Sequence, residues 1–143
     1  DAREIECSVT GNDEITAYIP GEIIPAHNFY DYEAKYTDPD GAQLKIPADL
    51  DETQRKRVRE IAVKAYETLD LSGLSRIDFF IDKKGKKIYL NEINTIPGFT
   101  SISMFPKMCA ASGLPYEKLI MYLLELAIER FKTARTFKSA VKV

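Results

Sequence analysis

Four polar side chains that could bind a metal ion and phosphate lie in two short stretches of the sequence. Arg76 and Asp78 are two residues apart in one apolar stretch, and Glu92 and Asn94 are two residues apart in another. Carboxylate and amide oxygens are hard ligands that suit Mg²⁺, which commonly takes waters and substrate phosphates as its other ligands. The pattern therefore predicts a magnesium site that holds phosphate groups, with an arginine beside it.

The two stretches are expected to pair as a β-hairpin. Residues 75–82 and 87–94 are rich in Ile, Phe, Tyr and Leu, and the segment KKGK at 83–86 is typical of a turn. Alternate residues of a strand share a face, so each polar pair lies on one face of its strand. The two faces coincide if the loop has an odd number of residues, as a three-residue loop around Gly85 would, and the four side chains then form one cluster.

The same residues also have a simpler explanation. Ion pairs are common on solvated sheets, and Arg76 paired with a neighbouring carboxylate would account for the pattern. Two carboxylates close together repel each other, and burying them is costly unless a cation or hydrogen bonds offset the repulsion. Spacing alone leaves both interpretations open.

The sequence around the cluster is similar to that of a known family. Three segments carry the resemblance, namely YEAKY at 32–36, GLSRIDF at 73–79 and NEINTIPGFT at 91–100. Together they resemble the D-alanine–D-alanine ligases of bacterial cell-wall synthesis, members of the ATP-grasp superfamily. The resemblance extends from about residue 3 to residue 131, which is nearly the whole chain.

The resemblance implies a role for each residue of the cluster. Asp78, Glu92 and Asn94 would bind two Mg²⁺ ions, or Mn²⁺, that bridge the phosphates of ATP, with Glu92 shared between the ions. Arg76 and the backbone amide of Gly98 would stabilise the charge that develops when an amine attacks an acyl phosphate.

The family match assigns further residues outside the cluster. Ser103 and the backbone amide of Met104 match the groups that hold the carboxylate of the second D-alanine, and Glu4 matches the acidic residue that binds the ATP ribose. Tyr36 resembles the tyrosine of a mobile loop that closes over the site and orients the first D-alanine. Lys35 resembles a loop lysine that reaches toward the phosphates. Such a loop would exclude water, which matters because acyl phosphates hydrolyse.

The activity implied is the ATP-dependent ligation of two D-alanines through a D-alanyl phosphate, for peptidoglycan precursor synthesis. The EAKY sequence at 33–36 disfavours a D-lactate ligase, whereas a D-serine ligase stays open. A different class of function, a non-catalytic magnesium-binding or structural module, also stays open. The chain begins near the middle of such a ligase. We therefore expect the missing N-terminal part to be its partner, the chain alone to be inactive and the full-length ligase to be a homodimer.

Composition fits a single domain or a piece of one. The chain has 143 residues, 45% of them hydrophobic, with a formal net charge of −2. This balance gives no general basic field that would attract nucleic acid. No apolar run reaches the length of a membrane span, and no signal peptide opens the chain. Cys7 and Cys109 are too few for a disulfide framework or a zinc site, which agrees with a reducing bacterial cytoplasm.

The remaining elements are expected to form an α+β fold, the C-terminal subdomain of ATP-grasp enzymes, with a mainly antiparallel sheet and helices packed on one side of it. Strand patterns at 4–10 and 14–19 flank the turn sequence GND at 11–13 and predict another hairpin. Asp51, with Gln54 three residues later, predicts the N-terminus of a helix.

Helical spacing of apolar residues predicts three helices, at 51 to about 72, at 103–112 and at 116–132. Two apolar stripes are assigned to the core. They are Val58, Ile61, Ala62, Ala65 and Leu69 in the first helix, and Leu119, Ile120, Leu123, Leu124, Ala127, Ile128 and Phe131 in the last. Residues 1–132 are expected to form the C-terminal part of the catalytic domain, and 133–143 a disordered tail.

Overall fold

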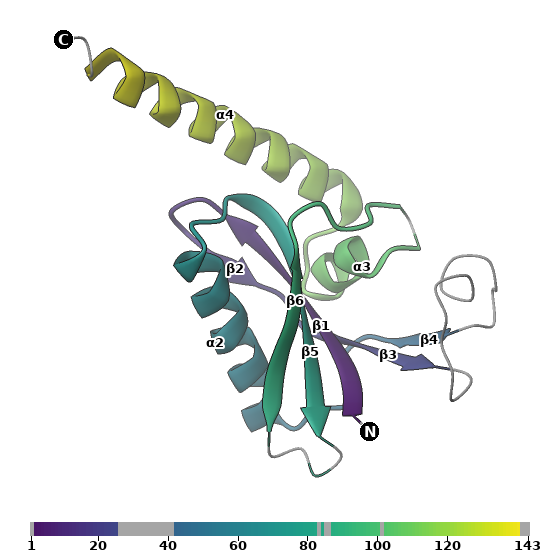
Figure 1. Cartoon of the computed structure of the whole chain (residues 1–143). Helices are drawn as coiled ribbons and strands as arrows, with labels where there is room; N and C mark the ends of the chain where they lie inside the picture. Colours follow the sequence, from purple (N-terminus) through teal and green to yellow (C-terminus); the bar gives the residue numbers. More distant parts are fainter. Residues whose placement is uncertain (1, 26–41, 83, 85–86, 101, 141–143) are drawn as a thin grey trace.

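An antiparallel sheet organises the chain (Figure 1). The computed structural model describes residues 2–25, 42–82, 84, 87–100 and 102–140. The strands are β1 (Ala2–Gly11), β2 (Thr16–Ala17), β3 (Gly21–Pro25), β4 (Ala42–Lys45), β5 (Gly73–Asp82) and β6 (Ile88–Asn94). Their order across the sheet is β4-β3-β1-β5-β6, with β2 beside β1, and these neighbours pair antiparallel.

Helices cover both faces of the sheet, so the predicted one-sided arrangement is wrong. The helix α2 (Glu52–Thr68) packs against one face and α3 (Met104–Ala111) against the other, each over its own buried clusters (Figure 1). In β1, the apolar residues of the alternating pattern face α2. The polar residues between them are buried as well, because α3 lies over their face, where the Ser8 hydroxyl donates to the Phe105 carbonyl (3.1 Å).

Two local predictions are confirmed, one at the first hairpin and one at the start of α2. β1 and β2 pair across the turn, with Val9 opposite Ala17. α2 begins with a capping box, in which the Asp51 carboxylate accepts from the Gln54 amide (2.8 Å) and the Gln54 side chain accepts from the Asp51 amide (3.1 Å). This exchange satisfies two backbone donors that the first turn of a helix otherwise leaves unpaired.

The predicted stripe of α2 belongs to the core only in part. Val58 and Ala62 are fully buried, whereas Leu69, just beyond the end of the helix, is 55% exposed. Tyr66, which the stripe omits, is fully buried, and its hydroxyl donates to the Gly11 carbonyl of β1 (2.9 Å). This tyrosine therefore ties the helix to the sheet through both its ring and its hydroxyl.

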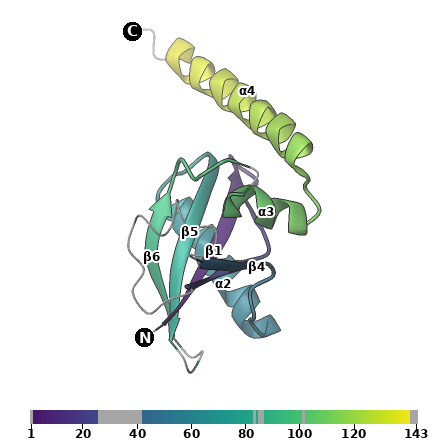
Figure 2. The same cartoon turned by 90° about the vertical axis from the view of Figure 1, so that its right-hand side faces the viewer.

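The last helix departs furthest from expectation. α4 (Tyr116–Ala140) is longer than the predicted helix and extends over residues 133–140, where a tail was predicted; 141–143 lie outside the described residues. Figures 1 and 2 show α4 projecting away from the sheet. Leu119 and Leu126 are buried, but much of the stripe assigned to the core is exposed, namely Ile120, Leu124, Ile128 and Phe131. Among the described residues, no helix combines the length and apolar character that a membrane span needs.

Candidate metal and phosphate site

β5 and β6 bring the four residues of the predicted cluster together. Asp78 lies opposite Glu92, and Arg76 lies opposite Asn94. Residues directly opposite each other in an antiparallel pair point to the same face, so the four side chains share one face of the sheet. The predicted juxtaposition is confirmed.

The hairpin reaches this arrangement by a different route from the predicted odd loop. The Asp82 amide donates to the Lys87 carbonyl (3.1 Å), which leaves four residues, an even number, between them. A β-bulge at Asn91 shifts the register by one residue and restores the pairing that the cluster needs. Gly85, around which the turn was predicted, lies outside the described residues.

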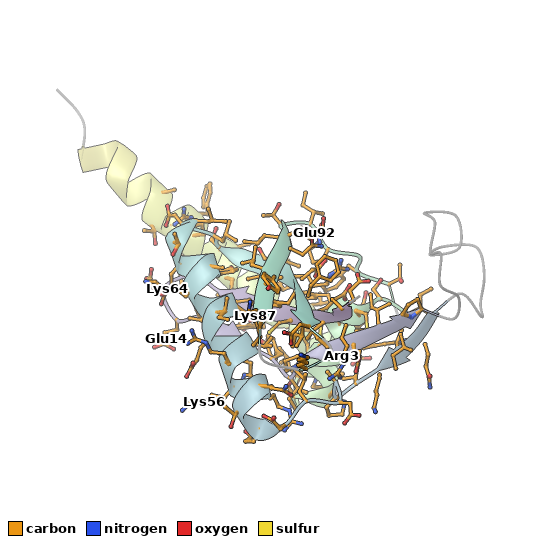
Figure 3. The ribbon with its side chains drawn as sticks, turned by 60° about the horizontal axis from the view of Figure 1, so that its bottom comes forward. Arg3, Glu14, Lys56, Lys64, Lys87 and Glu92 are labelled. Carbon is orange, nitrogen blue, oxygen red and sulfur yellow. The ribbon has the colours of Figure 1, made fainter. Side chains whose placement is uncertain are left out.

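Hydrogen bonds join the four side chains into one network. The Arg76 guanidinium donates to both Asp78 oxygens, from Nε to Oδ1 (2.8 Å) and from Nη2 to Oδ2 (2.7 Å). The Asn94 amide nitrogen donates to Asp78 Oδ2 and to Glu92 Oε1, at 3.0 Å each. Asp78 is buried, whereas Glu92 is exposed on the edge strand β6 (Figure 3). The network therefore runs from the interior of the sheet to its surface.

Burial and charge act in opposite directions on this network. Burial alone would lower the pKa of the Arg76 guanidinium, but the hydrogen bond to Asp78 and the nearby carboxylates raise it above its ordinary value. Burial raises the pKa of Asp78, and the hydrogen bond to Arg76 offsets only part of that rise, while the charge of Glu92 adds to it. A further cation beside the two carboxylates would favour their ionised forms.

The donor set fits a divalent cation. The Asn94 amide nitrogen bridges one oxygen of Asp78 and one of Glu92, and a cation between the two carboxylates would satisfy the same oxygens. If its amide turned over, Asn94 would offer an oxygen ligand instead. No group of three or more His, Cys, Asp or Glu side chains forms a metal cage within the described part of the chain. A partial shell of this kind suits Mg²⁺, which draws ligands from water and phosphate.

Other predicted ligands lie on the same face of the sheet. Glu4 of β1 is opposite Phe80 of β5, which points to the same face as Asp78. Met104, the first residue of α3, packs against Ile23 of β3, and Ile23 is opposite Glu4. The start of α3 and the polar face of β1 are therefore neighbours.

The loop between β6 and α3 holds Gly98 close to Ser103. A Cβ added to Gly98 would lie 3.0 Å from the Ser103 Oγ. That hydroxyl accepts from the Thr100 amide (3.0 Å), and the Ser103 amide donates to the Thr100 carbonyl (3.0 Å). The backbone at 98 is thus free of a side chain, and the loop that follows it is held by hydrogen bonds between Thr100 and Ser103. Lys35 and Tyr36 lie outside the described residues.

Comparison with known proteins shows which family this chain belongs to. A family model described as D-ala D-ala ligase C-terminus matches residues 1–125. The chain belongs to the D-alanine–D-alanine ligase family. It is 77% identical to the D-alanine–D-alanine ligase of Treponema denticola over 139 residues, which are 97% of this chain and 38% of that protein. The ligase of Shouchella clausii is 53% identical over 139 residues, with the same two shares, 97% and 38%. The chain thus spans well under half the length of these ligases.

Solved structures of ligases contain the same fold. The D-alanine–D-alanine ligase from Coxiella burnetii matches with a TM-score of 0.83 and 42% identity, over 97% of this chain and 35% of that chain. The VanG D-Ala:D-Ser ligase from Enterococcus faecalis matches with a TM-score of 0.76 and 39% identity, over 88% of this chain and 36% of that chain. The predicted ATP-grasp C-terminal subdomain is confirmed.

In this ligase segment, Glu6 of β1 joins the cluster without having been predicted. β1 pairs with β5 so that Glu6 lies opposite Asp78 and Ser8 lies opposite Arg76. Glu6 is fully buried, and its Oε1 lies 3.3 Å from the Arg76 Nη2. The sequence did carry a signal, because polar and apolar residues alternate over 4–10. The pairing of β1 with β5 was the missing information.

Proposed function

We propose that this chain supplies the C-terminal part of the ATP-grasp catalytic domain of a D-alanine–D-alanine ligase. The carboxylate of the first D-alanine takes the terminal phosphoryl group of ATP, which gives D-alanyl phosphate and ADP. The amine of the second D-alanine then attacks the acyl carbon and displaces phosphate, which gives D-alanyl-D-alanine. The observation that carries the proposal is the cluster of Arg76, Asp78, Glu92 and Asn94 on one face of the sheet, in a chain of this family.

Asp78, Glu92 and Asn94 would hold two Mg²⁺ or Mn²⁺ ions, with Glu92 shared between them. When bound, the ions would neutralise charge on the ATP phosphates. The hydrogen bonds of the Asn94 amide nitrogen to both carboxylates support this assignment, because they show that the two carboxylates can share one positively polarised group.

Arg76 would stabilise the negative charge that develops on the carbonyl oxygen of the acyl phosphate. A guanidinium suits this role because it stays charged and presents several fixed donors. Its bidentate contact with Asp78 supports a preorganised orientation. The Gly98 amide would be a second donor, since no side chain at this position blocks the approach of a substrate.

Ser103 and the Met104 amide would hold the carboxylate of the second D-alanine. The Ser103 side chain makes no capping hydrogen bond to α3, so it leaves the first amides of that helix to an anionic group. Glu4 would bind the ATP ribose. Lys35 would reach the phosphates and Tyr36 would orient the first D-alanine, with both residues on a loop that closes over the site.

The partner of this chain would be the remainder of a longer ligase. The chain corresponds to 38% of the T. denticola ligase, and the remainder would carry most of the groups that hold the nucleotide and the first D-alanine. The exposed apolar side chains of α4, including Leu124 and Ile128, support such a contact, since large exposed apolar surfaces commonly bind other protein surfaces. The complete ligase would be a homodimer in a bacterial cytoplasm, and this chain alone would be inactive.

A chimera that joins this chain to the rest of the T. denticola ligase tests the proposal. We expect ADP release that depends on D-alanine. Glu92→Gln and Arg76→Lys should each lower kcat by about 100-fold. The first removes the negative charge of a metal ligand, and the second keeps the positive charge but loses the fixed donors of the guanidinium. Glu67→Gln, on the exposed surface of α2, should leave kcat unchanged. Unchanged turnover in Glu92→Gln would contradict the metal assignment, and D-alanine-independent ADP release would contradict the ligase.

A D-alanine–D-serine ligase is the second candidate, favoured by the match to VanG at 39% identity. Mass spectrometry of the products formed from equal D-alanine and D-serine distinguishes the two ligases. A mixed dipeptide in excess over D-alanyl-D-alanine would favour the serine ligase. Mn²⁺ binding by the chimera without any dipeptide would favour a non-catalytic metal-binding module.

A further inference from the structure

The proposed reaction gives no role to Glu6, although this residue lies inside the cluster. Its side chain is fully buried on β1, directly opposite Asp78 of β5. On the other side of β1, its neighbour is Gly21 of β3. Met104 of α3 fills the space beside that glycine, since a Cβ there would collide with the Met104 methyl group. Glu6 is therefore enclosed by β3, β5 and α3.

The buried Glu6 carboxylate lies beside a cation. Removing an ionised carboxylate from water is strongly unfavourable unless an opposite charge or hydrogen bonds replace the water. The Arg76 Nη2 lies 3.3 Å from Glu6 Oε1 and 2.7 Å from Asp78 Oδ2. One guanidinium thus bridges two buried carboxylates on neighbouring strands. Glutamine would fill the same space without the charge, so packing alone does not explain a glutamate.

The two carboxylates contact Arg76 from different strands. β5 lies between β1 and β6, so Glu6 comes from the strand on the far side of β5 from Glu92 and Asn94. Asp78, in contrast, accepts from Asn94 and, at both of its oxygens, from Arg76. A metal ion that binds Asp78 would therefore have to share these oxygens with the guanidinium. A guanidinium held by Asp78 alone would compete with that ion for the same oxygens and be repelled by its charge.

We infer that Glu6 is a positioning residue, whose buried carboxylate holds the Arg76 guanidinium on the β1 side of the site so that Asp78 can serve the metal. This inference rests on the proposed roles of Arg76 and Asp78. Without the charge of Glu6, Arg76 would keep only its bidentate contact with Asp78, and a metal ion would have to compete with the guanidinium for both Asp78 oxygens. Both metal binding and catalysis are then weakened, as is usual when a group that orients a metal site is lost.

Glu6→Gln in the T. denticola chimera tests the inference, because glutamine keeps the size of the side chain and removes its charge. Glu22→Gln is the matched control. Glu22 is also buried (6% exposed), and two hydrogen bonds of 2.7 Å join it to a different arginine, Arg3. It lies opposite Ile5, on the face of the sheet that α2 covers. The measurements are Mn²⁺ affinity by electron paramagnetic resonance without nucleotide, kcat and KM for D-alanine, and urea unfolding.

Glu6→Gln should weaken Mn²⁺ binding and lower kcat, each by about tenfold, with little change in KM for D-alanine. Glu22→Gln should lower stability and leave both quantities unchanged. The inference is overturned if Glu6→Gln affects stability alone, as its control does. If Glu6→Gln does not fold, Glu6→Asp decides, because its shorter side chain draws the carboxylate away from Arg76. A wild-type Mn²⁺ affinity in Glu6→Asp would then overturn the inference.

The same experiments separate this inference from the proposed function. A wild-type chimera that releases no ADP with D-alanine refutes the proposed ligase. The Mn²⁺ affinities of Glu6→Gln and Glu22→Gln still decide the role of Glu6, because that comparison requires no turnover.

Discussion

At Gly98, an added methyl group would press against the Ser103 hydroxyl. A Cβ there would lie 3.0 Å from Ser103 Oγ, and the next atom, Ser103 Cβ, would be at an ordinary distance of 3.6 Å. Gly98→Ala is therefore expected to push the hydroxyl away from the Thr100 amide. The loss of this hydrogen bond should destabilise the chain by about 1 kcal/mol, measured by urea unfolding.

A double-mutant cycle isolates this clash. In the Ser103→Ala background the Oγ is gone, so Gly98→Ala should cost less than about half of what it costs in the wild type. Equal costs in the two backgrounds would show that the effect arises elsewhere, for example in the conformation of the loop backbone.

The residues of the candidate site differ in how far the sequence could reveal them. Arg76, Asp78, Glu92 and Asn94 lie in a local hairpin, so strand alternation was enough to place them on one face. Glu6 reaches the same cluster through a pairing between distant strands, which a single sequence does not specify. The predicted roles of the four residues came from the family resemblance, because spacing alone did not exclude an ordinary surface ion pair.

Among the elements, the hairpin of β5 and β6 has one irregularity in its pairing, the bulge at Asn91. The register on the turn side of Asn91 differs by one residue from the register on the site side. If Asn91 were deleted, the regular ladder would continue and Glu92 would still lie opposite Asp78. We expect this deletion to change the unfolding free energy of the chain by less than about 1 kcal/mol and the Mn²⁺ affinity of the chimera by less than about twofold.

Deletion of Ile93 is the contrasting variant, because it would move Asn94 to the opposite face of β6. We expect this variant to lose most of its Mn²⁺ affinity. Weak Mn²⁺ binding in the Asn91 deletion would instead show that the bulge itself shapes the site.

The sequence predicted an element well where the interactions that define it join residues close together in the chain. The capping box of Asp51 and Gln54 has a fixed spacing, so the start of α2 followed directly from the sequence. The bulge at Asn91 was missed because one extra residue in a strand has no compositional signature. Helices on both faces were missed because alternating polar residues, as in β1, normally indicate a solvated face. Here that face of β1 is buried because α3 lies over it.

At the scale of the whole molecule, α4 contacts the rest of the chain through its first half. Leu119 and Leu126 are buried. The Asn12 side chain donates to the Leu126 carbonyl (2.9 Å) and to the Glu129 carboxylate (2.7 Å). Beyond these contacts the helix projects away from the sheet (Figure 2). Within the attached half, Ile128 is 55% exposed. Helical periodicity shows that a stripe is apolar but not what covers it, and the stripe was therefore wrongly assigned to the core.

Two leucine substitutions should distinguish the attached face of α4 from the exposed one. Leu119→Ala removes a fully buried side chain and should lower the unfolding free energy of the chain by about 2–5 kcal/mol. Leu124→Ala is the matched control, because its side chain is 54% exposed, and it should change the unfolding free energy by less than about 0.5 kcal/mol. Urea unfolding measures both.

A cost above about 2 kcal/mol for Leu124→Ala would mean that this face is already covered in the isolated chain. In that case stability should rise with protein concentration, since self-association would supply the cover.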